Sequence, residues 1–332
     1  MNGPVATAEL LADRGAAVES EELFRSRPFL EAEGVTHTLR ISASDRELLA
    51  PLIVREIDDG PERDAISPYG YPGLVEGGRG GARGSLPAVA PPGTPPTAFA
   101  LDRESIDFSD ADVVTVFLRH TLAEPPLTGA TERNVVQIAD PALPAKTRGS
   151  DRNRINKNVR LGYVVRIVPG PETTVAERAG FLAAYEQTMR RTGAAERYFF
   201  GAAYFDRILE SDRTWLALAE APGGELAAAS LAAASDGFLH YYLSGSTDAS
   251  LRDSPMKNVV AALVALSAEF ELPLNLGGGI SSGDRLEEFK RGFANRELPW
   301  HSSEIVCDAA AYARLSSGRD PGGFFPAYRA PS

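Results

Sequence analysis

The stretch NLGGGISSGDRLEEFKRGF, residues 275–293, decides how the second half of the chain folds. The apolar residues that end at Leu276 predict a short buried strand. Three consecutive glycines follow, and glycines at a strand end allow a ligand or another backbone to approach closely. A short helix then places Phe289 and Phe293 four residues apart on one face. We therefore expect a strand, a bare-backbone turn and a helix that carries Lys290 beside two rings.

The glycine spacing does not indicate a nucleotide-binding loop. A Rossmann motif needs a complete βαβ unit and an acidic residue after the next strand, whereas the helix after Gly279 has barely three turns. The chain has no G-x-x-x-x-G-K-[ST] sequence, so we expect no P-loop. The N-terminus of this helix is instead expected to offer free N–H groups to an anion or a carbonyl group.

The rest of the second half predicts an antiparallel meander between helices. The predicted elements are a helix at Thr174–Thr192, strands at Trp215–Ala219, Leu226–Ala232 and Phe238–Leu243, a helix from a Ser254-Pro255 cap to Glu271, and a last strand at Leu298–Cys307. A meander followed by a helix and a further strand is typical of an α+β (mixed α/β) fold rather than a doubly wound parallel sheet.

The first half predicts a second mixed unit. Residues 1–30 read as a polar lead-in with one helical piece, and the predicted elements are that piece at Ala16–Phe24 and strands at Val35–Ser42, Leu49–Ile57, Ala111–Phe117 and Asn134–Ile138. Residues 66–98 are rich in glycine and proline, which predicts a loop. Its first residues, SPYGYPG, form a rigid turn with Tyr69 and Tyr71. We place the domain boundary between 1–162 and 163–332.

Composition and charge exclude several classes of function. The net charge is −11, which argues against tight non-specific binding to DNA. No apolar run reaches the roughly 18–20 residues of a membrane span. The four histidines and single cysteine have no metal-ligand spacing, so no metal site is expected. A single cysteine fits a reducing cytoplasm.

One basic cluster stands out in this acidic chain. It lies in the segment that starts at Lys146 and includes Arg152, Arg154, Lys157 and Arg160. We expect a helix that is capped by Ser150 or Asp151 and ended by Gly162. Two interpretations stay open, a solvated helix face and a surface that follows nucleic-acid phosphates.

Four stretches in this order resemble the FemABX-type transferases of the GNAT-like N-acyltransferase superfamily. They are DAISPYGYPG, NRINKNVRLGYVVRIV, HYYLSGSTDASLRDSPMKNVVAAL, and the strand ending LGGG with D-x-L-x-x-F-K-x-G-F. The resemblance implies two GNAT-like domains packed around a shared substrate channel. It also implies transfer of an acyl group, often aminoacyl from aminoacyl-tRNA, to an amine. The acceptor class is a small peptide or amino sugar of the natural-product or cell-wall type, free or bound to a carrier protein.

The segment before the second-half helix distinguishes two donors. A CoA-dependent GNAT domain binds pyrophosphate with a glycine-rich loop there. Residues 250–257 contain no glycine, Pro255 lacks an N–H group, and Asp253 adds negative charge. These features disfavour a CoA pyrophosphate, which agrees with the donor that the resemblance implies, so we expect aminoacyl-tRNA as co-substrate and no bound cofactor. The alternatives are an acyl-CoA-dependent N-acetyltransferase and a non-catalytic peptide-binding member.

The resemblance also implies a set of site residues. Lys290, at the channel edge, would bind phosphate or stabilise the oxyanion in catalysis, and Phe289 would stack on a base. The same helix alternatively carries two core phenylalanines beside two solvent-exposed cations, Lys290 and Arg291. The substrate-binding residues would be Gly277, Gly278 and Gly279 as channel wall, Tyr242 and Ser244 facing the acceptor, and Tyr69 and Tyr71 from the other domain. The tRNA-binding residues would be Arg152, Arg154, Lys157 and Arg160.

Overall fold

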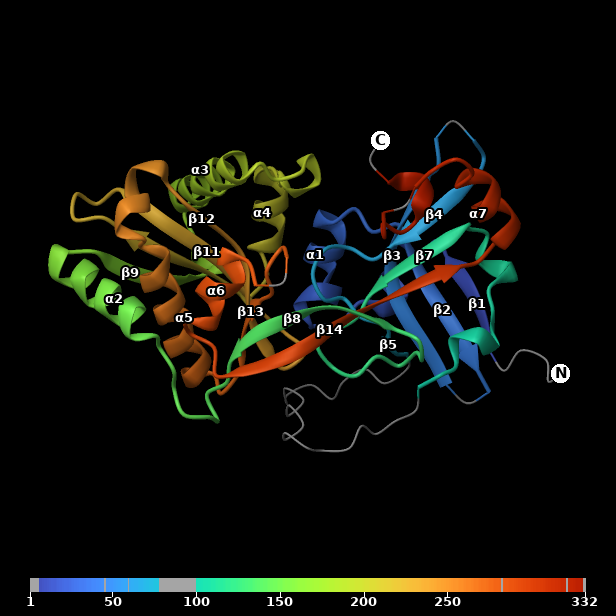
Figure 1. Ribbon diagram of the computed structural model, residues 1–332, viewed down its shortest axis with the longest axis horizontal. Coiled ribbons are helices and arrows are strands. Elements are labelled where there is room, and N and C mark those ends of the chain that lie inside the picture. Colours follow the sequence, from blue (N-terminus) through green and yellow to red (C-terminus); the bar gives the residue numbers. More distant parts are fainter. Residues whose placement is uncertain are drawn as a thin grey trace. The chain divides into compact units, whose positions relative to one another are not determined.

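The computed structural model describes residues 6–44, 46–58, 60–77, 100–281, 283–320 and 322–330 (Figure 1). The chain forms two compact units, Met1–Arg133 with Trp300–Ser332, and Asn134–Pro299. These limits differ from the predicted domains 1–162 and 163–332. Helix α2 (Gly149–Leu161) packs on α5 (Met256–Glu269) of the second unit. Strand β14 (Arg296–Val306) pairs with β7 (Thr115–Arg119) of the first unit.

The first unit contains a mixed sheet with the strand order β6-β1-β2-β3-β4-β7-β14. Its other strands are β1 (Ala6–Leu11), β2 (His37–Ala43), β3 (Arg46–Glu56), β4 (Arg63–Ile66), β5 (Val75–Glu76) and β6 (Ile106–Asp107). The β1–β6 and β4–β7 pairs are parallel, the other pairs within this unit are antiparallel, and β5 pairs with β3. Helices α1 (Arg27–Ala32) and α7 (Ala309–Leu315) belong to this unit.

The sequence predicted the strands of this unit better than its N-terminal region. The predicted strands at 35–42, 49–57 and 111–117 are confirmed as β2, β3 and β7, with shifted ends. The predicted helix at Ala16–Phe24 is wrong, because this segment contains only 3-10 turns at Ala16–Val18 and Leu23–Arg25. Strand β1 and helix α1 were not predicted. Most of the predicted loop at 66–98 lies outside the described residues, and its described part, 66–77, includes β5.

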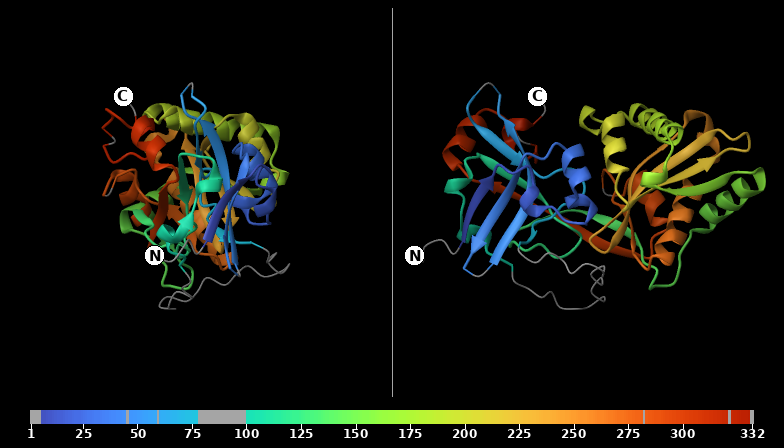
Figure 2. Two further views of the ribbon diagram at one scale, coloured as in Figure 1. Left: turned by 90° about the vertical axis from the view of Figure 1, so that its right-hand side faces the viewer. Right: turned by 180° about the vertical axis from the view of Figure 1, so that it is seen from behind.

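The second unit contains a sheet with the order β8-β13-β12-β11-β10-β9. The strands are β8 (Thr131–Ala139), β9 (Val164–Pro169), β10 (Thr214–Glu220), β11 (Leu226–Ser235), β12 (Phe238–Ser246) and β13 (Leu274–Gly277). Only the β12–β13 pair is parallel among these described strands. Helices α3 (Val175–Thr192) and α4 (Ala202–Ile208) lie on one face, and α5, α6 (Arg285–Arg291) and α2 lie on the other (Figures 1 and 2).

The residues of the second unit explain its two layers. Small alanines of β10 and β11, such as Ala217 and Ala228, form one core with Val259 and Leu263 of α5. Small side chains let a helix lie close to a sheet, and the buried apolar area stabilises the contact. Helix α3 begins with a capping box, in which the side chains of Thr174 and Glu177 bond each other's backbone N–H groups.

The mixed α/β fold class is confirmed. The predicted order of helix, three-strand meander, helix, strand, helix and strand is confirmed as α3, β10–β12, α5, β13, α6 and β14. Helices α4 and α7 were not predicted. None of the helices in the described ranges is long and apolar enough to cross a membrane.

Candidate functional site

The glycine turn after β13 closes on the side chain of Lys290. Gly277 has a φ of 76°, in the left-handed region that favours glycine. Lys290 Nζ donates a 2.7 Å hydrogen bond to the carbonyl oxygen of Gly278. A Cβ atom on Gly277 would lie 3.0 Å from Nζ, and one on Gly278 would lie 2.9 Å from the carbonyl oxygen of Val135. Larger residues at either position would displace the turn or the lysine.

Lys290 is a buried cation with a perturbed proton affinity. The residue is only 8% exposed. Burial lowers the pKa of its ammonium group to about 8, and the negative charge of Asp284 partly opposes this shift. The alternative of two solvent-exposed cations is thus wrong for Lys290. It holds for Arg291, whose half-exposed side chain pairs with Glu287.

Phe289 of α6 and Phe293, which lies two residues beyond the end of this helix and so not on its face as expected, both belong to the core of the second unit. Phe293 is 1% exposed, and Phe289 packs against the same buried cluster. Their ring centroids lie 5.7 Å apart in an edge-to-face arrangement. This packing holds the helix that carries Lys290 against the sheet. Stacking of Phe289 on a base stays a prediction.

The Asp284 side chain caps α6, so the Glu287 N–H group, one of those expected to be free, already has an acceptor. The carboxylate of Asp284 accepts hydrogen bonds from the backbone N–H groups of Glu287, Ile280 and Ser281, at 2.8, 2.7 and 3.0 Å. These bonds lower the pKa of Asp284. A Cβ atom on Gly279 would lie 2.6 Å from Asp284 Oδ1. The third glycine therefore makes room for the cap.

Strands β12 and β13 separate close to this turn. They pair only at Leu239 with Leu274 and at His240 with Asn275. Asn275 Nδ2 lies 3.1 Å from His240 Nδ1 in the buried interior. Burial lowers the pKa of His240 to about 4, so its imidazole is neutral at neutral pH. Beyond this point, Tyr241 and residues 243–246 of β12 pair with β11 among the described strands.

A β-bulge in β12 turns the predicted acceptor-facing residues in different directions. Leu231 of β11 pairs with Leu243, whereas the adjacent Ala232 pairs with Tyr241, so Tyr242 is the extra residue. A bulge interrupts the alternation of side chains along a strand.

The hydroxyl groups on β12 show where these side chains lie. The Tyr242 hydroxyl lies 2.9 Å from that of Tyr204 in α4. Ser244 Oγ donates a 2.6 Å hydrogen bond to the Tyr241 hydroxyl, and Tyr241 packs against the core under α5. The structure therefore does not bring Tyr242 and Ser244 together. Burial raises the pKa of Tyr241 to about 12, so this hydroxyl keeps its proton at neutral pH.

The basic helix α2 carries its cations in a different setting. Arg152, Lys157 and Arg160 are exposed, and half-buried Arg154 lies 3.9 Å from Asp253. Ion pairs at this distance on a surface contribute little to stability. The prediction that Gly162 ends the helix is confirmed.

The predicted caps of α2, Ser150 or Asp151, are wrong, because the helix starts at Gly149 and Arg148 is the N-cap residue. Asp151 is instead 3% exposed and accepts from Lys257 Nζ at 2.7 Å. This ion pair offsets part of the free-energy cost of burying the Asp151 carboxylate. The first turn of α2 is thereby tied to the first turn of α5.

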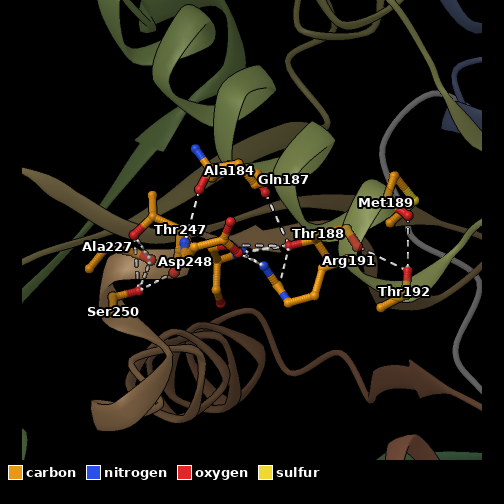
Figure 3. Close-up of polar contacts among 11 residues, drawn as sticks. Ala184, Gln187, Thr188, Met189, Arg191, Thr192, Ala227, Thr247, Asp248 and Ser250 are labelled. Carbon is orange, nitrogen blue, oxygen red and sulfur yellow. Dashed lines mark hydrogen bonds and ion pairs between the residues drawn. The ribbon is translucent and has the colours of Figure 1, made fainter.

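The segment between β12 and α5 is fixed by internal contacts (Figure 3). It forms a 3-10 helix at Asp248–Asp253. The backbone N–H of Asp248 donates to Gln187 Oε1 at 2.9 Å, and the Asp248 carboxylate pairs with Arg191. Ser250 Oγ donates to the carbonyl oxygen of Ala227 at 2.6 Å.

The start of α5 also uses its own backbone donors. Ser254 has a φ of 52° and Pro255 is the N-cap residue without a side-chain cap, so the predicted serine cap is wrong. The N–H groups of Lys257 and Asn258 donate to the carbonyl oxygens of Ser254 and Pro255 at 3.1 and 2.9 Å. Asp253 accepts from the Tyr163 hydroxyl at 3.0 Å. A phosphate at this segment would therefore meet the Asp253 carboxylate and the N–H groups of Lys257 and Asn258, which already have acceptors.

The two tyrosines of the SPYGYPG turn lie in the first unit beside other aromatic rings. The Tyr71 ring lies 5.7 Å from Phe24 and 5.9 Å from Trp300. The Tyr69 ring lies 5.6 Å from the guanidinium of Arg119. The sequence pattern identified the tyrosines but missed Arg119 and Trp300, because these residues are distant in sequence from the turn. No trio of metal-ligating side chains occurs within the described ranges.

Comparisons with known proteins agree with this architecture. Residues 145–291 match the acetyltransferase (GNAT) domain family. The fold is similar to that of FemX, with a TM-score of 0.56 at 9% identity over 87% of this chain and 93% of that chain. It is also similar to the C-terminal DUF2156 domain of a protein from Agrobacterium fabrum described as a lysylphosphatidylglycerol synthetase. That comparison has a TM-score of 0.53 at 12% identity over 90% of this chain and 91% of that chain. No curated protein matches by sequence.

Residues 145–291 therefore match an acetyltransferase (GNAT) domain, and the chain shares its fold with FemX. The expected FemABX-type architecture is confirmed at the level of fold.

Proposed function

We propose that the protein transfers an aminoacyl group from aminoacyl-tRNA to the amine of a small peptide or amino-sugar acceptor. The occupied start of α5 is the observation that carries this choice of donor. Binding of a CoA pyrophosphate requires backbone N–H groups that point outward. Here the N–H groups of Lys257 and Asn258 bond within the turn, and Asp253 places a carboxylate beside it.

The proposed chemistry requires little covalent assistance. The acceptor nitrogen attacks the carbonyl carbon of the aminoacyl ester, an N–C bond forms, and the C–O bond to the terminal ribose breaks. The amine loses a proton and the ribose oxygen gains one. Positioning of the two substrates supplies most of the rate enhancement in such a reaction.

Lys290 is the proposed stabiliser of the tetrahedral oxyanion. Its Nζ donates a hydrogen bond to the carbonyl oxygen of Gly278 in a buried environment, where electrostatic interactions are stronger than in water. A pKa of about 8 leaves it mostly protonated at neutral pH. The residue can therefore donate to a developing negative charge.

The basic helix α2 is the proposed contact for the tRNA backbone. Arg152, Lys157 and Arg160 are exposed on one short helix in a chain with net charge −11. Lysine and arginine side chains bind phosphates by displacing counterions. A local cluster of this kind can hold RNA against an otherwise acidic surface.

An acyl-CoA donor is the second candidate, because the matching family is described as an acetyltransferase domain. The two donors are separated by incubating the protein with charged total tRNA, and in parallel with a set of acyl-CoAs, in the presence of candidate amines. We expect loss of the aminoacyl-ester bond that depends on both protein and amine. Consumption of an acyl-CoA with stable aminoacyl-tRNA would reject the proposed donor.

A further inference from the structure

Arg119 of β7 is surrounded by aromatic rings within the first unit. Its guanidinium carbon lies 5.6 Å from the centroid of Tyr69, 5.6 Å from that of Phe117 and 5.8 Å from that of Trp300. Cations are attracted to aromatic faces at these distances. The rings therefore hold the guanidinium in place without neutralising its charge.

No acid pairs with this arginine within the described part of the chain. Its Nε atom is buried and has no hydrogen-bond partner there. The neighbouring Arg133, 5.7 Å from the same Phe117 ring, differs in this respect. Arg133 pairs with Glu304 and donates to Ser302 Oγ at 2.6 Å. A buried donor without a partner in the protein is unusual and indicates a position for a water, an ion or a ligand group.

The surroundings of Arg119 are fixed by further contacts. Trp300 Nε1 donates to the carbonyl oxygen of His120 at 3.0 Å. His120 Nε2 lies 2.8 Å from Ser303 Oγ. Burial lowers the pKa of His120 to about 4, so this neighbour is uncharged at neutral pH. The backbone N–H of Arg119 donates to Ser67 Oγ at 3.1 Å. The unpaired guanidinium is thus held in a rigid frame.

We infer that Arg119 binds an oxyanion of the acceptor, a carboxylate or a phosphate. A guanidinium has two flat faces and a planar edge of N–H donors that matches either group in a bidentate arrangement. Tyr69, Phe117 and Trp300 contact the cation through their rings, so hydrogen bonding remains for the ligand. Naming the ligand as the acceptor rests on the proposed function, whereas the site itself belongs to the first unit.

Fluorescence of Trp300 can report binding directly. The chain has two tryptophans, and Trp215 of the second unit packs on Phe270 at 5.1 Å. A Trp215→Phe background leaves Trp300 as the only tryptophan. The probes are phosphoethanolamine, glycyl-glutamate and ethanolamine, which supply an amine with a phosphate, with carboxylates, and with no anionic group. No donor is present in this assay.

We expect a saturable change in emission with at least one anionic amine and none with ethanolamine. Arg119→Gln should weaken binding by at least about tenfold, because it removes a charge-assisted bidentate contact. Arg119→Lys keeps the charge but loses the planar edge, so its affinity for the anionic amine should fall between those of the parent protein and Arg119→Gln. Arg63→Gln is the matched control, because it removes one charge from a partly exposed arginine that is already paired with Asp112.

The results separate the two proposals. Binding of phosphoethanolamine alone assigns a phosphate, and binding of glycyl-glutamate alone assigns a carboxylate. Equal affinities in Arg119→Gln and its parent, an equal response to ethanolamine, or no response to any probe would overturn the inference. If Arg119→Gln does not fold, unchanged affinity in Arg119→Lys has the same meaning. Failure of aminoacyl transfer with Arg119-dependent binding intact would count against the donor proposal alone.

Discussion

Lys290 and the cations of α2 belong to the same compact unit, yet their environments are opposite. Lys290 is 8% exposed, bonds a backbone carbonyl and has a pKa lowered to about 8. Arg152, Lys157 and Arg160 are exposed to solvent. The first kind of cation acts on a group placed within hydrogen-bonding distance. The second kind acts through a salt-sensitive field.

The difference lies in the backbone around each cation. The glycine turn leaves space for an ammonium group against Gly278, and α6 is fixed above it by Phe293. On α2, the inward positions are taken by Asp151 and Asn158, which bind residues at the start of α5. The remaining positions of α2 therefore face outward. The environment of Lys290 suits the proposed stabilisation of an oxyanion, and the exposed face of α2 suits the proposed binding of a large anion such as tRNA.

Replacement of Lys290 is expected to have the largest effect. Lys290→Met should lower turnover by roughly 10²–10³, the usual cost of losing one donor to a developing oxyanion. The fold should persist, because methionine fills a buried position without the cost of burying a charge. Turnover with saturating donor and thermal unfolding measure the two effects.

Lys146→Met is the matched control for this variant, because it removes an exposed lysine from the same unit that is not among the proposed tRNA contacts. Its turnover with saturating donor should equal that of the parent protein. Wild-type turnover in Lys290→Met would remove the lysine from the chemistry and leave it as a structural residue of the glycine turn.

The glycine turn can be tested separately from the lysine. Gly278→Ala would place a Cβ atom 2.7 Å from Asn134 Nδ2 and 2.9 Å from the carbonyl oxygen of Val135. We expect a loss of about 1–3 kcal/mol of unfolding free energy, the usual range for overpacking. Urea unfolding checks this, with Gly149→Ala as control because a Cβ atom there meets nothing within 4 Å. Equal stability of both variants would show that the turn opens easily.

The burial of Lys290 predicts a pH dependence of stability. Its pKa is about 8 in the folded chain and 10.5 for the ordinary side chain. Between these values the unfolded state binds more protons, so this group makes the folded state more stable as pH rises. The wild type should gain about 2 kcal/mol over Lys290→Met between pH 7.5 and 9.5. Urea unfolding of both proteins at the two pH values measures it.

Two outcomes sharpen this comparison. A stability difference that stays constant with pH would mean that Lys290 is solvated. If its cation stabilises the oxyanion, turnover should fall as pH rises through about 8, whereas a turnover that rises over the same range would favour a role as base.

The sequence predicted the elements with strong periodicity and missed those that depend on tertiary contacts. The meander β10–β12 and helices α3 and α5 follow their hydrophobic patterns, and glycines mark the turns around them. Helix α4 has seven residues and is held by Phe205 in the core, so its local pattern is weak. The first strand, β1, lies in a stretch whose register becomes clear only beside β2.

The site shows the same limit. The motif F-K-x-G-F identified Lys290, but sequence alone does not distinguish an exposed lysine from one buried on the Gly278 carbonyl. The bulge at Tyr242 redirects the side chains of β12, and the local sequence contains no pattern that predicts it. Arg119 was missed because its rings come from residues as distant as Tyr69 and Trp300.

The smallest expected effect concerns α2, and it tests the exposed side of the comparison. Arg152→Glu combined with Lys157→Glu should weaken tRNA binding and reduce the slope of log affinity against log salt by about 2, roughly one unit for each lost phosphate contact. Turnover with saturating aminoacyl-tRNA should stay near that of the parent, because these side chains do not touch the glycine turn. Arg190→Glu with Arg207→Glu is the control of equal charge, since these arginines lie on α3 and α4 and pair with Glu186 and Glu210. Filter binding of tRNA over a salt series gives the slopes. If both double variants change the slope equally, only net charge matters and α2 is a solvated helix face; a change confined to the α2 variant assigns this helix to the RNA.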